Sequence, residues 1–537
     1  MRPSVLPIMV AVCSVICGCA ARIDAQSPSV RQAAYLKASN PGMYDHFGEG
    51  GALPGHTGNT VSISADGSTI VVGAPHESSA ATGINGNQND DSAGNAGAVY
   101  VYTRSGNNWT QQAYIKASNA GRGDYFGSSV DLSADGNTMA VAAHWEASDA
   151  TGINGNQQDD SIPQAGAVYI FTRSGGRWSQ QAYIKSSNTG EKLPAEGDAL
   201  VGGGDGDQFG FSLALSADGN TLAVGAVGED STATGINGDQ TNNAAVSAGA
   251  VYVFRRAGST WAQQAYVKPQ TAANAAGGDL FGFSLGLSAD GNTLAVGVYD
   301  EGGSARTVNG PVDNMRGGSG AAYVFTRTGA TWAQQAYIKT SISEQGDSWG
   351  VSLALSDDGN TLALGSVDED CTAVGVNPPG CTEDVKTDVS TGAVAIFTRT
   401  GTTWSQQALL KASNTGVEDW FGVKLALSGD GNSLVVTASN EDSAAQGING
   451  NQNDDTATEA GAAYFFTRTG TTWAQQAYIK SAVNEAFDEF GNSASISRNG
   501  RTLVVGGRGE DGGAGGVNRN ASDNSVDESG AAFVFTR

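Results

Sequence analysis

Two acidic positions recur in each of seven copies of one sequence unit and could bind a cation. An Asp stands two residues before a Phe-Gly or Trp-Gly dipeptide, and a Glu follows an apolar run later in the same unit. The Asp residues are Asp45, Asp124, Asp207, Asp279, Asp347, Asp419 and Asp488, and the Glu residues are Glu77, Glu146, Glu229, Glu301, Glu369, Glu441 and Glu510. Carboxylate oxygens suit Ca²⁺, but they also fix loops by accepting backbone hydrogen bonds.

The segment after the Glu is rich in Asn, Asp and Gly, a composition that calcium loops use. It reads GINGNQNDDS at 83–92, GINGNQQDDS at 152–161, GINGDQTNN at 235–243 and GINGNQNDDT at 447–456. The candidate calcium ligands are therefore Asp124, Glu146, Asp207, Glu229, Asp419 and Glu441. The alternative is that these carboxylates brace the loops, which repetition in every unit also favours. Units four, five and seven lack the full GINGNQ text, which weakens the case for a metal.

The elements that position these residues are four short strands in each unit. FGFSLALS and NTLAVGA flank an Ala-Asp-Gly turn, while AVYVFTR and WxQQAYIK flank a Thr-Gly or Ser-Gly turn. The unit repeats at a period of about 70 residues. Four antiparallel strands repeated seven times predict an all-β, seven-bladed β-propeller, with the Phe-Gly strand innermost. The Asp precedes strand one and the Glu follows strand two, so both belong to the same face.

The two ends of the chain predict how the ring closes. The last unit stops at Phe533–Arg537, a third strand without a fourth, and Gln32–Lys37 is a fourth strand with no blade before it. We expect the N-terminal strand to complete the last blade, which leaves fewer exposed strand edges. The propeller is assigned to residues 32–537.

The composition excludes some partners. The 537 residues contain 29 Lys and Arg against 54 Asp and Glu, a net charge of −25. Such a protein repels a phosphate backbone, so we expect no nucleic-acid partner. Beyond the N-terminus no apolar segment approaches membrane-spanning length. We also expect the protein to be a monomer.

The N-terminus predicts an export signal. MRPSVLPIMVAVCSVICGC has one Arg before an apolar run of signal-peptide length. Ile16-Cys17-Gly18-Cys19 resembles a bacterial lipobox, which predicts a signal peptide over 1–18, lipidation of Cys19 and a tether over 19–31. Ordinary secretion is the alternative. The expected location is the bacterial cell envelope, as an outer-membrane lipoprotein held to the membrane only by its lipid, or the exterior as a secreted protein.

Cysteine and histidine offer two further features. Cys371 and Cys381 are the only Cys residues after the N-terminal segment, and their short separation predicts a disulfide formed in an oxidising compartment. His46, His56 and His76 could meet on one face of the first unit. Exposed loop histidines are the alternative interpretation, and no arrangement typical of an enzyme is apparent.

The order of motifs resembles a known family. Phe-Gly, an apolar strand, Gly73-Ala74-Pro75 and then GAVYVF are similar to the FG-GAP repeat of the integrin alpha-chain propeller, over residues 32–537. The resemblance implies adhesion or ligand binding. The family's D-x-D-x-D-G calcium loop is here only Ser-Ala-Asp-Gly-Asn-Thr, too short for six or more oxygen ligands. That calcium site is therefore not carried over.

These observations favour an exported, lipid-anchored, non-enzymatic binding or adhesion module. We expect a protein or glycan ligand on the face that carries the long loops, and Ca²⁺ as the one cofactor to test. One alternative is a carbohydrate-active or other hydrolase or lyase that uses carboxylates at the propeller mouth. Such an enzyme should break the sevenfold symmetry, whereas the acidic positions are uniform. The other alternative is a purely structural envelope protein.

Overall fold

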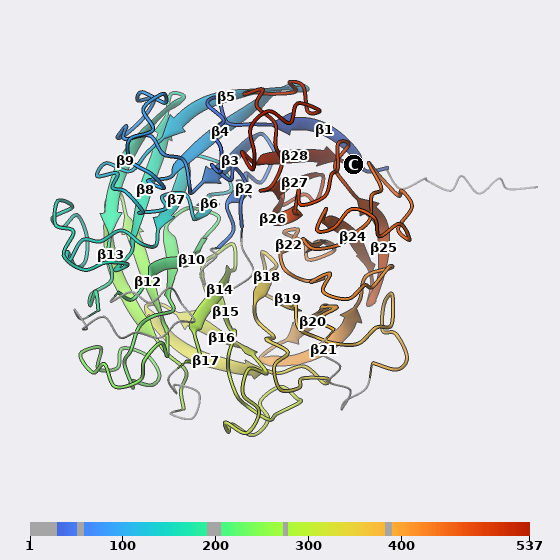
Figure 1. Cartoon of the computed structure of the whole chain (residues 1–537). Coiled ribbons are helices and arrows are strands. Elements are labelled where there is room, and N and C mark those ends of the chain that lie inside the picture. The colour runs from blue at the N-terminus through green and yellow to red at the C-terminus, as the bar shows by residue number, and fades with distance from the viewer. Residues whose placement is uncertain (1–28, 51–57, 191–205, 272–277, 382–388) are drawn as a thin grey trace, which may run out of the picture.

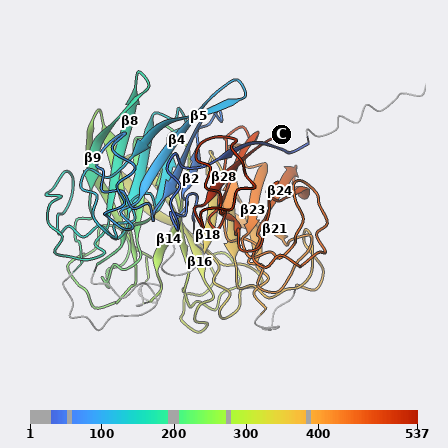
Figure 2. The same cartoon turned by 45° about the horizontal axis from the view of Figure 1, so that its top comes forward.

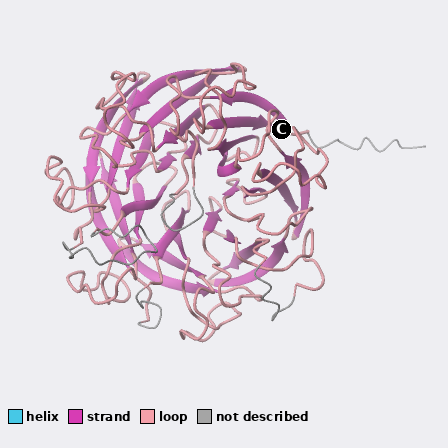
Figure 3. Ribbon diagram, in the orientation of Figure 1, coloured by secondary structure: helices cyan, strands magenta, loops and turns pink. Residues whose placement is uncertain are grey.

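The computed structural model describes residues 29–50, 58–190, 206–271, 278–381 and 389–537. Within these ranges the regular elements are 28 strands, arranged as seven four-stranded sheets around a central axis (Figures 1 and 3). No helix in the described part of the chain has the length and apolar character to cross a membrane. The predicted signal peptide, Cys19 and His56 lie outside the described residues.

Each blade is an antiparallel sheet whose strands follow one another in sequence. Blades one and two contain β2 Val61–Ile63, β3 Thr69–Ala74, β4 Ala98–Ser105, β5 Asn108–Ile115, β6 Ser129–Leu132, β7 Thr138–Ala143, β8 Ala167–Ser174 and β9 Arg177–Ile184. Blades three and four contain β10 Phe209–Leu215, β11 Thr221–Ala226, β12 Ala250–Ala257, β13 Thr260–Val267, β14 Phe281–Leu287, β15 Thr293–Val298, β16 Ala321–Thr328 and β17 Thr331–Ile338. Blades five and six contain β18 Ser352–Leu355, β19 Thr361–Ser366, β20 Ala393–Thr400, β21 Thr403–Leu410, β22 Leu425–Leu427, β23 Ser433–Ala438, β24 Ala462–Thr469 and β25 Thr472–Ile479.

The seventh blade is built from both ends of the chain. It contains β26 Phe490–Ile496, β27 Thr502–Gly507, β28 Ala531–Thr536 and β1 Arg31–Leu36. β1 pairs antiparallel with β28, with Tyr35 opposite Phe533, and the strand order is β1-β28-β27-β26. The predicted propeller and its closure by the N-terminal strand are both confirmed.

The Phe-Gly dipeptide lies at the contact between neighbouring blades. Gly127 has φ of +97°, and a Cβ there would lie 2.6 Å from the carbonyl oxygen of Ala98 in the preceding blade. Gly97 has φ of +78°, and a Cβ there would lie 2.1 Å from the carbonyl oxygen of Phe126. Both glycines are required, since any side chain would strain the backbone and push the blades apart. In blades one, two, five and six, strand one begins after the dipeptide, so it is shorter than the sequence predicts.

The hydrophobic core lies between blades. One cluster joins Val71 and Val101 of blade one to Phe126, Val141 and Tyr169 of blade two. The Phe126 and Tyr169 rings pack edge to face with centroids 5.3 Å apart, a favoured aromatic geometry. A matching cluster joins the strands of blade seven to blade one. The interface at which the ring closes is therefore packed like the interfaces between the other blades.

Candidate functional site on the long-loop face

All seven long segments between strands two and three leave the propeller on one side, here called the long-loop face. The short hairpins that connect strands three and four lie on the other side (Figure 2). Both recurring acidic positions belong to the long-loop face, as predicted from the strand order. The face is therefore the candidate site, and its chemistry depends on what the carboxylates contact.

Every recurring Glu forms a buried ion pair with a Lys that follows the outermost strand of its blade. The pairs are Glu77–Lys116 at 2.7 Å, Glu146–Lys185 at 2.8 Å, Glu229–Lys268 at 2.9 Å, Glu301–Lys339 at 3.0 Å, Glu369–Lys411 at 2.6 Å, Glu441–Lys480 at 2.7 Å and Glu510–Lys37 at 2.6 Å. Each Lys side chain is fully buried. A buried ammonium needs a charged partner, so the Glu supplies one inside every blade.

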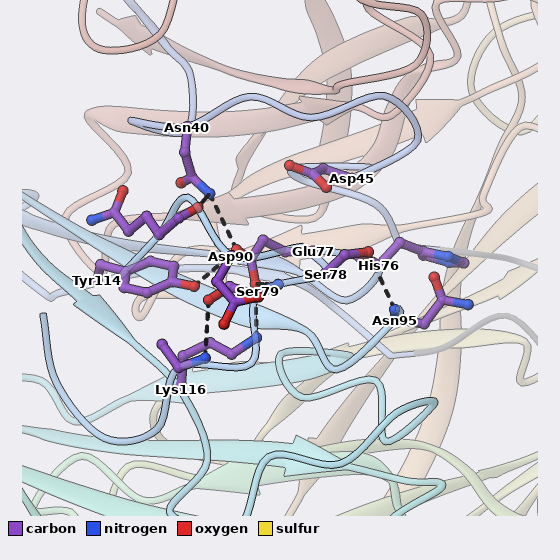
Figure 4. Close-up of polar contacts among 12 residues, drawn as sticks. Asn40, Asp45, His76, Glu77, Ser78, Ser79, Asp90, Asn95, Tyr114 and Lys116 are labelled. Carbon is purple, nitrogen blue, oxygen red and sulfur yellow. Dashed lines mark hydrogen bonds and ion pairs between the residues drawn. The ribbon is translucent and has the colours of Figure 1, made fainter. Parts of the chain in front are cut away.

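The other acceptor positions of the Glu are also used, as blade one shows (Figure 4). Tyr114 donates its hydroxyl to Glu77 Oε1 at 2.8 Å, and Asn40 Nδ2 donates to the same oxygen at 3.1 Å. The backbone N–H of Ser79 donates to Oε2 at 3.2 Å. A Tyr occupies the Tyr114 position in every blade except blade five, which has Leu409. The Glu thus connects the long loop to the outer strand.

The Asn of the GIN motif clasps the loop to the same strand. The backbone N–H of Asn85 donates to the Tyr114 carbonyl at 2.7 Å, and the Tyr114 N–H donates to Asn85 Oδ1 at 3.0 Å. The same side-chain bond is made by Asn154, Asn237, Asn309, Asn377, Asn449 and Asn518. The clasp therefore occurs in all seven blades, including those without the full GINGNQ text.

The recurring Asp residues are buried beside the Glu residues. Asp124 accepts the backbone N–H of Gly121 at 2.7 Å, and burial raises the pKa of Asp124 to about 6, with the charge of Glu146 adding to the rise. Burial likewise raises the pKa of Asp419 to about 7 and that of Asp207 well above its usual range. The structure thus brings each candidate Asp close enough to its Glu to interact electrostatically.

The contacts of the three Glu residues among the six candidate calcium ligands match the bracing interpretation. Glu146, Glu229 and Glu441 each accept hydrogen bonds from a Lys and a Tyr. Calcium binding itself stays a prediction. The Lys and Tyr partners of the Glu were not predicted from the sequence. A Lys follows the outer strand of every blade, and Lys is seldom buried without a partner. This recurring Lys could therefore have indicated an acidic partner.

A calcium titration separates the two interpretations. Because each Glu is already paired with an ammonium, we expect millimolar Ca²⁺ to leave the melting temperature unchanged within error, with Mg²⁺ and chelator as controls. A saturable increase that the Asp124→Asn variant loses would instead identify the carboxylates as calcium ligands.

The buried Asp residues predict how stability depends on pH. Burial raises the pKa of Asp488 to about 8, with the charge of Glu510 adding to the rise. The folded state then holds a proton that the unfolded state has released above about pH 4. The protonated Asp488 therefore contributes its full stabilisation below about pH 4, and this stabilisation is lost as the pH rises towards 8. Asp488→Asn keeps an oxygen that can accept the Glu485 N–H but does not titrate.

We therefore expect wild-type protein to melt at a lower temperature at pH 8 than at pH 5. The melting temperature of Asp488→Asn should fall less over the same pH change. One pKa unit corresponds to about 1.4 kcal/mol, so the variant should retain roughly 1 to 3 kcal/mol more stability across this range. Urea unfolding at both pH values measures the difference, and Asp91→Asn on an exposed loop is the matched control. Equal losses in wild type and Asp488→Asn would contradict the prediction.

Cys371 and Cys381 form the predicted disulfide, with their Cα atoms 5.4 Å apart. The bond lies in the long loop of blade five, where Asn377 still makes the clasp. Cys371 also donates its backbone N–H to Glu369 Oε1 at 3.1 Å. The disulfide therefore closes a loop that is already braced to its blade.

One part of the face breaks the sevenfold symmetry. His46, Glu49 and His76 converge near the channel mouth, and Glu49 Oε2 lies 3.2 Å from His46 Nδ1 and 3.1 Å from His76 Nε2. His46 and His76 therefore meet, as the sequence allowed, while Glu49 was not anticipated. Glu49 directly follows Phe47-Gly48, and no other unit has an acidic residue at this position. This difference between the units could have singled out Glu49 in the sequence.

The channel between the inner strands holds a cavity of about 250 Å³. Apolar side chains such as Leu213 and Leu353 line it, together with Asp131 and Lys424. Asp131 accepts hydrogen bonds from the backbone of Leu132 and Leu215, both at 2.8 Å. Burial lowers the pKa of Lys424 to about 8. These two charges are absent from strand one of the other blades, so the cavity is also asymmetric.

The fold and the long-loop face define a β-propeller with braced loops, and sequence comparison refines this class. The FG-GAP repeat family matches residues 109–171 and 404–466. Each match runs from the outer strand of one blade to the third strand of the next, the same offset that closes the ring. The chain is therefore a seven-bladed β-propeller that carries FG-GAP repeats in two places.

Other comparisons add no functional argument. No curated protein is similar enough in sequence to count as a relative. A periplasmic gluconolactonase of Pseudomonas aeruginosa is 14% identical, covers 85% of this chain and 98% of its own, and has a TM-score of 0.44. A putative 6-phosphogluconolactonase from Bacteroides uniformis is 11% identical over 78% of this chain and 84% of its own, with a TM-score of 0.42. The WD40 repeats of RRP9 are 10% identical, cover 94% of this chain and 100% of their own, and have a TM-score of 0.44.

Proposed function

We propose that the protein is an exported binding or adhesion module whose long-loop face takes a protein or glycan partner. The observation that carries the proposal is the bracing of the loops. Each long loop is tied to its blade by an Asn clasp and a buried Glu–Lys pair. A rigid scaffold that holds exposed loops in place is the usual arrangement of a binding surface.

The loop tips between these ties remain available to a partner. In blade one, Asn87, Asn89 and Asp91 are exposed, whereas Glu77 and Lys116 beneath them are buried. Amides and carboxylates of this kind form hydrogen bonds with sugar hydroxyls and with cationic protein groups. The net charge of −25 favours a partner of low negative charge.

Export and anchoring belong to the same proposal. The disulfide between Cys371 and Cys381 is compatible with an oxidising compartment outside the cytoplasm. Lipidation of Cys19 would attach the propeller to the cell envelope through the tether over 19–31. Incorporation of a labelled fatty acid, lost in the Cys19→Ser variant, would support the anchor, and unlabelled wild type would favour secretion.

Binding is tested on a glycan array and a panel of cell-surface proteins, with and without calcium. We expect saturable binding to one partner, weakened about tenfold or more by replacing Asn87, Asn89 and Asp91 with Ala. Asn107→Ala, exposed on a hairpin of the opposite face, is the matched control and should bind like wild type. Binding that depends on Asn107 and not on the loop tips would overturn the proposal.

The enzymatic alternative keeps one specific observation in its favour. An enzyme should place unique polar residues in one or two blades, and His46, Glu49 and His76 do so at the mouth. The seven acidic positions of the braces remain uniform, and their charges are paired internally. We therefore favour the binding module over an enzyme as the proposed function.

A further inference from the structure

We propose that His46, Glu49 and His76 form a binding site for a divalent transition-metal ion such as Zn²⁺ at the channel mouth. One ligand atom from each residue lies within 4.8 Å of the other two. Two imidazoles and one carboxylate are a ligand set that zinc sites use.

Two of the three spacings between the ligand atoms suit a tetrahedral ion. Glu49 Oε2 lies 3.2 Å from His46 Nδ1 and 3.1 Å from His76 Nε2. Ligands bound at about 2.1 Å to a tetrahedral zinc ion lie about 3.3 to 3.5 Å from one another. Small movements of the two side chains would therefore place all three atoms at bonding distance.

The fold holds the three residues in place. His46 and Glu49 flank Phe47-Gly48, which packs at the junction with blade seven, and His46 has φ of +51°. His76 comes directly before Glu77, whose buried pair with Lys116 fixes the end of that segment. In blade two the same three positions are Tyr125, Ser128 and Trp145, so the set is not a repeated brace.

A second layer of charged groups supports the ligands. His46 Nε2 lies 3.0 Å from Glu528 Oε2, and a carboxylate on the far nitrogen is the usual support of a metal-binding imidazole. Arg508 lies 2.7 Å from Glu489 and 3.5 Å from Glu49. Counted formally, the three carboxylates outnumber the one guanidinium by two negative charges. That charge matches a divalent cation.

The cluster is largely buried, and His76 is its most exposed residue. The Glu49 side chain is 3% exposed, that of His46 is 11% exposed and that of His76 is 24% exposed. The partial exposure of His76 would let water or a donor atom of a bound molecule reach the ion as a fourth ligand, as in zinc sites that keep an exchangeable ligand.

Calorimetric titration of the purified full chain with Zn²⁺ tests the site. We expect a binding step with Kd on the order of 1 μM or tighter. His76→Ala, the mildest change because His76 is the most exposed ligand, should remove one equivalent of zinc. Glu528→Gln should weaken that step about tenfold while leaving the ligands in place. Co²⁺ in place of zinc should give the intense visible absorption of a tetrahedral site, again lost in His76→Ala.

His144→Gln is the matched control, because His144 lies near the mouth but outside the cluster. It should keep the full zinc stoichiometry. Melting curves in chelator confirm that each variant is folded. The proposal is overturned if wild type and His76→Ala bind the same number of zinc ions, or if wild type shows no step tighter than about 100 μM. In that case His46 and His76 serve only as hydrogen-bond partners of Glu49.

Discussion

Replacing Glu146 with Gln should lower the free energy of unfolding by about 3 to 5 kcal/mol, because it leaves the Lys185 ammonium buried without a charged partner. The Lys185 side chain is fully buried, 2.8 Å from Glu146 Oε2. Glu146 also accepts from Tyr183 at 2.8 Å and Asn119 at 2.9 Å, so the change disturbs a network of hydrogen bonds. Urea unfolding followed by tryptophan fluorescence measures the loss.

Two further variants make this result specific. Asp160→Asn lies on the same loop but is exposed, and it should change stability by less than about 0.5 kcal/mol. The double variant Glu146→Leu/Lys185→Met removes both charges and should recover much of the loss. A decrease below about 1 kcal/mol for Glu146→Gln would show that the pair contributes little and that the clasp at Asn154 holds the loop.

The variant also has a diagnostic pH dependence. Burial lowers the pKa of Lys185, so the folded state releases its proton at a lower pH than the unfolded state does. Stability that depends on this group therefore rises with pH through the basic range. Without Glu146 the ammonium loses its main support, and the variant should regain stability at pH 9 more strongly than wild type does.

Removing residues 1–38 should have the second large effect, since it deletes β1 and opens the ring. Leu36 is fully buried between blades seven and one, and Tyr35 and Lys37 contact Glu510 at 2.5 and 2.6 Å. Their loss leaves Glu510 buried without its charge partner and exposes the edge of β28 to other chains. We expect the truncated protein to form oligomers and to lose its cooperative melting transition, as measured by light scattering and calorimetry.

Removal of residues 1–28 is the matched control, because it retains β1 and should leave a monomer with the wild-type melting temperature. A synthetic peptide covering residues 29–40 should bind the longer truncation and raise its melting temperature, since the missing strand would be supplied in trans. A monomeric truncation with an unchanged melting transition would show that β1 is dispensable for closure.

The braces and the mouth cluster divide the long-loop face into two kinds of chemistry. The seven Glu–Lys pairs satisfy their charges inside the blades. His46, Glu49 and His76 occur in one blade, and His76 is partly exposed to solvent. Tests of stability therefore address the first set, and tests of ligand binding address the second.

The sequence alone determined the seven blades, their four strands and the closure by the N-terminal strand. These follow from local patterns, namely the apolar strands, the turn residues and the complementary ends of the chain. The short separation of Cys371 and Cys381 likewise sufficed to predict their disulfide. Each of these features depends on residues close together in the chain or on a motif that repeats.

Only the tertiary structure decided what the carboxylates contact. Lys116 follows Glu77 by 39 residues, and the loop must fold back onto the outer strand before the pair can form. Glu528 is 482 residues from His46, and the two meet because the ring closes between blades seven and one. Contacts of this kind depend on the packing of distant segments, which strand periodicity and turn signals do not specify.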